Sequence, residues 1–81
     1  MSINDIERMD TLMATVTKSM LSGGAYLKID GLDDAEPTVR LYDGIVCDGD
    51  KVLVSVQKIS DDRYYIKTTL DSILRTNYIV A

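Results

Sequence analysis

The sequence contains no histidine, no tryptophan and no phenylalanine, and it has only one cysteine and one proline. Histidine is the commonest general base and metal ligand because its pKa lies nearest neutrality, so most enzyme mechanisms lose their usual participant. The single cysteine, Cys47, cannot form an internal disulfide, and its neighbours Ile45 and Val46 predict that it packs as a small hydrophobic residue. We therefore expect a protein that is not an enzyme and that needs no cofactor.

Long apolar runs and an excess of positive charge are also missing. No run approaches the roughly 18 apolar residues of a membrane span, and no basic start with an apolar leader precedes Ser22, which predicts a cytoplasmic protein without a membrane partner. Thirteen acidic against nine basic residues give a formal net charge of -4, which argues against a nucleic-acid partner. A chain of 81 residues predicts a single domain over residues 1–81.

The first quarter of the sequence has the spacing of an amphipathic helix. Ser2 followed by Asp5 resembles a capping box, which predicts a helix start near Ile3, and the pair Gly23 and Gly24 predicts its end. We therefore expect a helix over residues 3–21. Its apolar stripe, at spacings of three and four, consists of Ile6, Met9, Met13, Val16 and Met20. The stripe would dock on the rest of the protein, or its methionines would contact another chain.

From about residue 25 the period changes to two, which is typical of strands. The alternation predicts strands near residues 26–30, 38–42, 51–59 and 63–70, a short helical turn over 71–75 and a final strand over 77–80. Asp43-Gly44 and Asp48-Gly49 are dipeptides of tight turns. The predicted fold class is α+β: an N-terminal amphipathic helix followed by a meander, over residues 25–81, that forms a small antiparallel sheet or an SH3-like or OB-like barrel of about five strands.

Acidic residues gather in two predicted loops. They are Asp30, Asp33, Asp34 and Glu36 in the first, and Asp43, Asp48 and Asp50 in the second. The spacing in the second loop does not fit a calcium loop, and acidic loops such as the first are more often solvated than bound to a cation. We therefore expect no metal site and interpret both groups as solvated turn and loop residues. The alternative is an acidic surface that imitates phosphates and blocks a basic, nucleic-acid-binding surface of a partner protein.

Tyrosines and basic residues are interleaved in the strand region. A single-stranded nucleic acid binder would stack nucleobases on such tyrosines and would contact phosphates with the basic residues around them. The residues concerned are Tyr26, Tyr42, Tyr64 and Tyr65 with Lys28, Arg40, Lys58, Arg63 and Lys67. The surrounding aspartates oppose this hypothesis.

The region from Ala25 to Thr69 contains YLKIDGL, then TVRLYDG, then DGDKVLVSVQKISDDRYYI. This order resembles the small barrel proteins of bacteriophage tails and baseplates and of related contractile injection machines. The resemblance implies a non-catalytic tail or virion component that assembles with itself or with neighbouring subunits; the N-terminal helix departs from that pattern, so a neck or connector protein fits as well.

The leading hypothesis from the sequence is therefore a structural or interaction protein, located in the host cytoplasm or the virion. It would form a homo-oligomer or contact assembly neighbours through exposed strand edges and through the methionine-lined helix. A small acidic inhibitor or regulator is the alternative.

Overall fold

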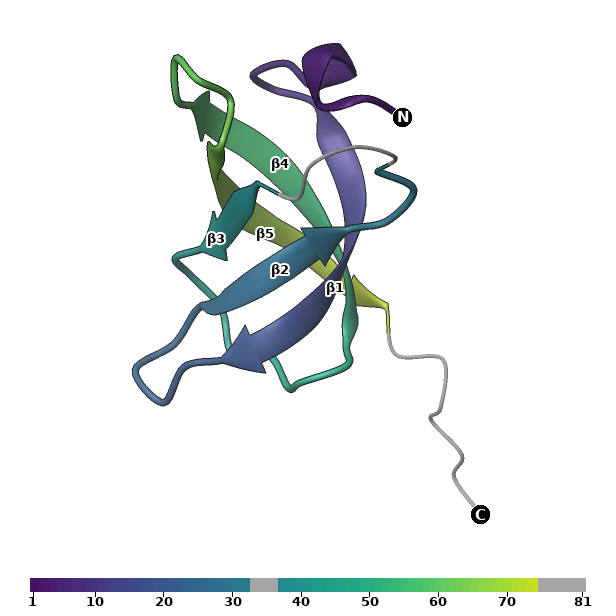
Figure 1. Cartoon of the computed structure of the whole chain (residues 1–81). Helices are drawn as coiled ribbons and strands as arrows, with labels where there is room; N and C mark the ends of the chain where they lie inside the picture. The colour runs from purple at the N-terminus through teal and green to yellow at the C-terminus, as the bar shows by residue number, and fades with distance from the viewer. Residues whose placement is uncertain (33–36, 75–81) are drawn as a thin grey trace.

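The computed structural model describes residues 1–32 and 37–74 of the chain (Figure 1). Within these residues the chain forms one short 3₁₀ turn, η1, and five β-strands. Their bounds are η1 Ile3–Asp5, β1 Thr11–Ser19, β2 Ala25–Ile29, β3 Thr38–Leu41, β4 Lys51–Ile59 and β5 Tyr65–Leu74.

The five strands close into a barrel in the order β1-β2-β3-β5-β4. The long strand β1 closes it, because β1 pairs with β2 along its second half and with β4 along its first half. The small β-barrel predicted from the sequence is confirmed. The simple antiparallel meander is wrong, because β3 pairs in parallel with β5 and not with the strand that follows it.

The predicted N-terminal helix over residues 3–21 is wrong, and with it the α+β class, since the described residues contain five strands and no α-helix. Most of this region is strand β1, in which Ala14 and Val16 point into the barrel while Met13, which precedes them, is exposed. Threonines and valine favour a strand because branching at Cβ restricts side-chain rotation in a helix. Pairing with two neighbouring strands then supplies the backbone hydrogen bonds.

The capping box at the start of the chain is confirmed, although it caps only three residues. Ser2 Oγ accepts from the amide of Asn4, and the amide of Ser2 donates to Asp5 Oδ2 at 2.9 Å. The turn stops after Asp5, because Ile6 is extended. A local cap therefore determines where a helical turn begins, but not how far it continues.

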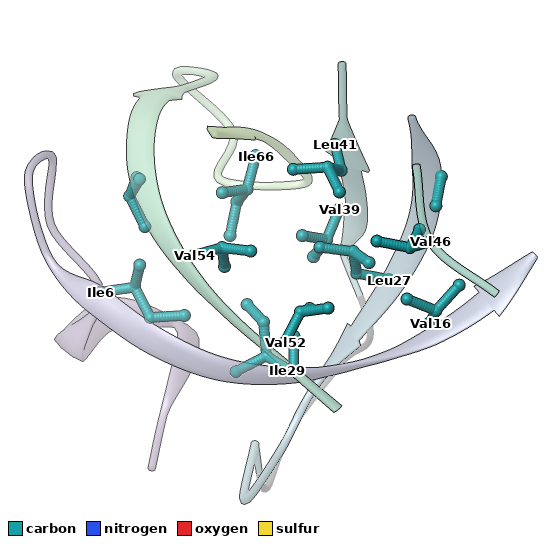
Figure 2. Packing of buried hydrophobic residues seen from close by; sticks show 13 residues of the cluster. Ile6, Val16, Leu27, Ile29, Val39, Leu41, Val46, Val52, Val54 and Ile66 are labelled. Carbon is teal, nitrogen blue, oxygen red and sulfur yellow. The ribbon is translucent and has the colours of Figure 1, made fainter. Parts of the chain in front are cut away.

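The core fills the interior of the barrel with aliphatic side chains (Figure 2). Alternate residues of β4 supply Val52, Val54 and Val56, each fully buried, as the period-two pattern predicts. Two residues outside the strands also belong to the core: Ile6, which follows η1, and Val46, which lies between β3 and β4. The residue after η1 and the connection between β3 and β4 thus add apolar side chains that no strand provides.

The Gly23-Gly24 pair ends a strand and not a helix. It lies in the turn from β1 to β2, and both residues have positive φ. At Gly24 a Cβ atom would lie 2.4 Å from the carbonyl oxygen of Leu41, so only glycine lets this turn pack against the end of β3.

Two predictions concern the C-terminal region. The short helical turn over 71–75 is wrong for its described part, because residues 71–74 continue β5. The predicted strand over 77–80 lies outside the described residues.

Candidate binding surfaces

The five residues of the predicted helical stripe do not share one surface. Ile6 and Val16 are buried in the core, with 0% and 2% exposure, so they are not available to a partner. Met9 and Met13 are exposed, at 72% and 40%, and Met20 is partly buried at the start of the β1–β2 turn. The stripe is lost because alternate residues of a strand point to opposite sides, whereas the helical spacing had projected them onto one side.

Exposed strand edges are short. Closure of the barrel pairs each strand with a neighbour on both sides over part of its length. In the second half of β5 the described pairings are with β4 only, because β3 pairs with residues 65–68. Assembly by extending a sheet edge stays a prediction.

The acidic residues of the second predicted loop hold backbone turns. Asp43 Oδ1 accepts from the amide of Leu70, and Asp50 Oδ2 accepts from that of Cys47. Asp48 Oδ1 accepts from the amide of Ser19 at 2.6 Å, and this hydrogen bond is the main reason why the pKa of the Asp48 carboxyl lies below its ordinary value of 3.8. These contacts fit the interpretation as turn residues.

Only Asp30 of the first acidic loop is described; Asp33, Asp34 and Glu36 lie outside the described residues. Its carboxylate accepts from Thr15 Oγ1 at 2.9 Å and from Lys51 Nζ at 2.6 Å. Desolvation opposes ionisation, but the hydrogen bonds from Lys51 and Thr15 and the charge of Lys51 outweigh it and lower the pKa of Asp30 below 3.8. Asp30 is thus occupied by contacts within the chain.

Tyrosines and cations form a cluster on the outer side of β2, β3 and β5, which we call the tyrosine–arginine cluster: Tyr26, Arg40, Tyr42, Tyr65 and Lys67. The guanidinium carbon of Arg40 lies 4.8 Å from the centre of the Tyr26 ring and 4.9 Å from that of Tyr42. Arg40 Nη1 also donates to the Tyr26 hydroxyl at 3.4 Å. Arg40 is therefore held by two aromatic rings through cation–π attraction.

Tyr42 connects this arginine to strand β5. Lys67 Nζ lies 5.1 Å from the centre of the Tyr42 ring, and the Tyr42 hydroxyl is hydrogen-bonded to that of Tyr65. This hydrogen bond, with desolvation, raises the pKa of the Tyr65 hydroxyl above its ordinary value of 10.0. Tyr42 and Tyr65 keep 50% and 38% of their surface exposed, so a ligand can reach their rings.

Strand register extends the cluster into a row around the barrel. Tyr26 of β2 faces Lys18 of β1 and Arg40 of β3. Arg40 faces Lys67 of β5, and Lys67 faces Lys58 of β4. In Figure 1 the end of β1 and the start of β2 lie at the lower left, and the end of β4 and the start of β5 lie at the upper left.

Arg63 and Tyr64 of the interleaved tyrosine and basic set lie apart from the cluster. Arg63 Nε and Nη2 donate to the carbonyl oxygens of Ile3 and Ile6, so this arginine tethers the N-terminal segment. Tyr64 is 55% exposed beside the β4–β5 turn and has no ring contact with a cation among the described residues.

A second surface, which the sequence did not predict, is apolar. Leu21 in the β1–β2 turn is fully exposed, and Ile45 between β3 and β4 is 85% exposed. The two loops lie together, because the amide of Gly24 donates to the carbonyl oxygen of Gly44 at 2.9 Å. We call Leu21 and Ile45 the apolar pole. Cys47, predicted to be packed, is exposed two residues further on; of the run from Ile45 to Cys47 only Val46 enters the core.

One hollow on the described surface has a volume of about 140 Å³, which is below the 300 to 1,000 Å³ typical of small-molecule sites, so it is too small for an ordinary substrate. It is lined by Thr17, Leu27, Lys28, Ile29, Leu32, Pro37 and Val39. Among the described residues no three histidine, cysteine or acidic side chains are grouped so that they could hold a metal ion.

No protein-family model matches the sequence, and comparison with curated proteins gives no significant match. Over residues 1–32 and 37–74, no helix has the length and apolar character needed to cross a bilayer. The surfaces described above therefore carry the functional argument.

Proposed function

We propose that this protein is a non-catalytic structural or interaction protein that joins other copies of itself or neighbouring subunits through the apolar pole. The observation that carries the proposal is the exposure of Leu21 and Ile45 on two loops that are hydrogen-bonded to each other. Single exposed apolar residues are common, but two branched aliphatic side chains on adjoining loops favour an interface.

The geometry of the pole suits a rigid contact. Gly24 packs closely on Leu41, and the Gly24 amide binds the Gly44 carbonyl, so both loops are fixed to the barrel and to each other. A partner that covers Leu21 and Ile45 therefore loses little conformational entropy in ordering them, and it gains about 25 cal/mol for each Å² of apolar surface buried.

The setting that we propose is a phage-type assembly, such as a tail, baseplate or neck. Its support is the resemblance of the strand motifs YLKIDGL and DGDKVLVSVQKISDDRYYI to small barrel proteins of phage tails. A closed barrel is a compact building block in which each described strand is paired on both sides over part of its length, and this limits aggregation through sheet edges in a subunit that must assemble in one geometry.

The test replaces the two pole residues together, Leu21→Asp with Ile45→Asp, and measures the native mass across a range of protein concentrations. We expect the unmodified protein to form oligomers as its concentration rises, and the variant to stay monomeric with an unchanged thermal unfolding transition. Met9→Asp is the matched control, because Met9 is also an exposed apolar residue but lies away from the pole.

Two results would contradict the proposal. One is a strict monomer at high concentration that also captures no neighbouring subunit. The other is an oligomer that survives in the pole variant but is lost on Met9→Asp or Met13→Asp, which would move the interface to the exposed methionines predicted from the sequence. The solvent accessibility of the Cys47 thiol gives an independent measure, because an interface at the pole slows its alkylation.

A further inference from the structure

We propose that the tyrosine–arginine cluster binds a short segment of single-stranded nucleic acid, which crosses the strands from β2 over β3 to β5. This is a second binding function and does not rest on the apolar pole. The rings offer stacking surfaces, the cations surround them in a row, and the row has a length suited to a few nucleotides.

The rings provide stacking without base specificity. Tyr42 is half exposed, and Tyr65 beside it keeps 38% of its surface exposed, so unstacked bases can reach both. Their hydroxyls are hydrogen-bonded to each other, which fixes the relative position of the rings before a ligand arrives. Stacking on such rings does not require a particular base, because every base has a π-face. A duplex keeps its bases stacked inside, so the rings favour a single strand.

Charges along the row are complementary to a phosphate backbone. Lys18, Arg40, Lys67 and Lys58 occupy register-paired positions on β1, β3, β5 and β4. None of the three lysines forms an ion pair with a carboxylate among the described residues. Lys51, by contrast, is neutralised by Asp30.

The net charge of -4 opposes nucleic-acid binding at this surface less strongly than the composition suggested. Described acidic side chains are held elsewhere by hydrogen bonds: Asp30 by Lys51 and Thr15, and Asp62 by Ser60 and Tyr64 in the β4–β5 turn. Asp48 and Asp43 lie nearest to the row, beside Ser19 and Leu70, and limit it on the side of the β3–β4 connection. Among the described residues Arg40, Lys58 and Lys67 form no ion pair with a carboxylate, whereas Lys18 interacts electrostatically with Asp48. Binding is therefore expected mainly at low salt.

Arg40 takes part both in the ring contacts and in the row of positive charges. Its guanidinium already rests on the Tyr26 and Tyr42 rings, and its Nε is buried without a hydrogen-bond partner in the described structure. A phosphate beside the guanidinium would gain a charge-assisted hydrogen bond, while the rings keep the group in position. Spacing supports a small footprint: the three strands β2, β3 and β5 span about 10 Å, since neighbouring strands lie about 4.8 Å apart. This length fits about two nucleotides in contact with the rings.

The experiment measures the fluorescence anisotropy of a labelled oligothymidylate and of a labelled oligouridylate, each of about twelve nucleotides, with the full chain. We expect binding at low salt to at least one of them, weaker binding to a duplex, and a slope of log K against log salt of about -2, because three phosphate contacts contribute about -0.7 each. Comparison of the oligothymidylate with the oligouridylate distinguishes DNA from RNA.

Substitutions test which residues contact the oligonucleotide. Tyr42→Ala is expected to weaken binding about tenfold, while Tyr42→Phe, which keeps the ring and loses the hydroxyl, stays within about twofold. Lys67→Gln is expected to weaken binding about fivefold and to make the salt slope less steep, whereas Lys51→Gln, with the same change of charge on a lysine outside the row, leaves both unchanged. Leu21→Asp with Ile45→Asp is expected to retain binding, which separates this proposal from the proposed function.

Four results would overturn the proposal: no binding to either oligonucleotide at low salt; equal losses for Lys67→Gln and Lys51→Gln; no loss for Tyr42→Ala in a folded variant; or equally tight binding of polyglutamate, since a surface that accepts any polyanion does not use its rings. Thermal unfolding of each variant shows that it is folded, so that a lost signal is not a lost structure.

Discussion

At the scale of single residues, two glycines with positive φ illustrate different reasons for a glycine in a turn. Gly24 has a φ of +80°, and a Cβ atom there would collide with the backbone of Leu41. Gly49 has a φ of +86°, but a Cβ atom there would meet nothing within 4 Å. Both positions disfavour an L side chain, and only Gly24 also excludes one by contact.

Gly24 and Gly49 give a prediction about stability. Gly24→Ala is expected to lower the free energy of unfolding by about 3 kcal/mol, since backbone strain and the contact with Leu41 add, whereas Gly49→Ala costs about 1 kcal/mol for the conformation alone. Urea denaturation followed by circular dichroism measures both. Equal losses in the two variants would mean that the close approach to Leu41 is not important.

Asp30 gives a prediction for pH. Its pKa in the folded protein is below the ordinary value of 3.8, so ionisation of its carboxyl stabilises the fold at any pH above 3.8. This stabilisation is lost as the pH falls through the folded pKa. We expect carboxyl NMR titration to find the pKa of Asp30 below 3.8 and to find it higher in Lys51→Gln, which removes its cationic partner. A pKa that does not move in Lys51→Gln would show that Lys51 does not stabilise the ionised form.

At the scale of elements, strand β1 is the informative case, because the sequence allows two periodic interpretations of it. The spacings of three and four predicted a helix whose stripe includes Met13 and Val16. The strand instead buries Val16 and exposes Met13, with 2% and 40% of their surfaces accessible. A strand period of two is also present, at Leu12, Ala14 and Val16, but a threonine-rich segment of nine residues does not by itself show which period applies.

Substitution distinguishes the two periods in solution. Met13→Asp is expected to change the free energy of unfolding by less than about 1 kcal/mol, because the side chain is already exposed to water. Val16→Asp is expected to prevent folding, because a charge would enter the barrel interior without a partner. Urea denaturation of both variants provides the measurement, and similar losses would support the helical stripe.

At the scale of the whole molecule, closure of the barrel depends on contacts distant in sequence. Thr11 pairs with Ser55, and Thr38 pairs in parallel with Tyr65. Such pairs form only after long segments of chain have been ordered, and the loss of entropy slows folding.

This topology gives a kinetic prediction. Refolding, followed by tyrosine fluorescence after rapid dilution from urea, is expected to take about milliseconds to seconds, and the circular dichroism of the product should lack a helical signal. Refolding in microseconds, or a strong helical signal in the folded protein, would contradict the closed barrel and favour the local helix.

The predictable parts of the fold were those determined by neighbouring residues. The alternation of Val52, Val54 and Val56 predicted a strand with a buried side, and Ser2 with Asp5 predicted a capped turn. The tyrosine–arginine cluster was predictable only as a set of residue types, because Tyr26, Arg40 and Lys67 come from three strands and meet through register. The apolar pole could not be predicted, since nothing near Ile45 in the sequence shows that Val46 turns inward and Ile45 outward.

The sequence by itself determined a small apolar interior, the bounds of β4 and the positions of the turns, because side-chain period, glycine and aspartate act through local backbone preferences. The tertiary structure decided that residues 11–19 are extended, that β3 lies beside β5 and that Arg40 faces Lys67. The physical reason is the same in each case: hydrogen-bond partners and burial come from segments far along the chain, and they outweigh a helical preference too weak to be stable alone.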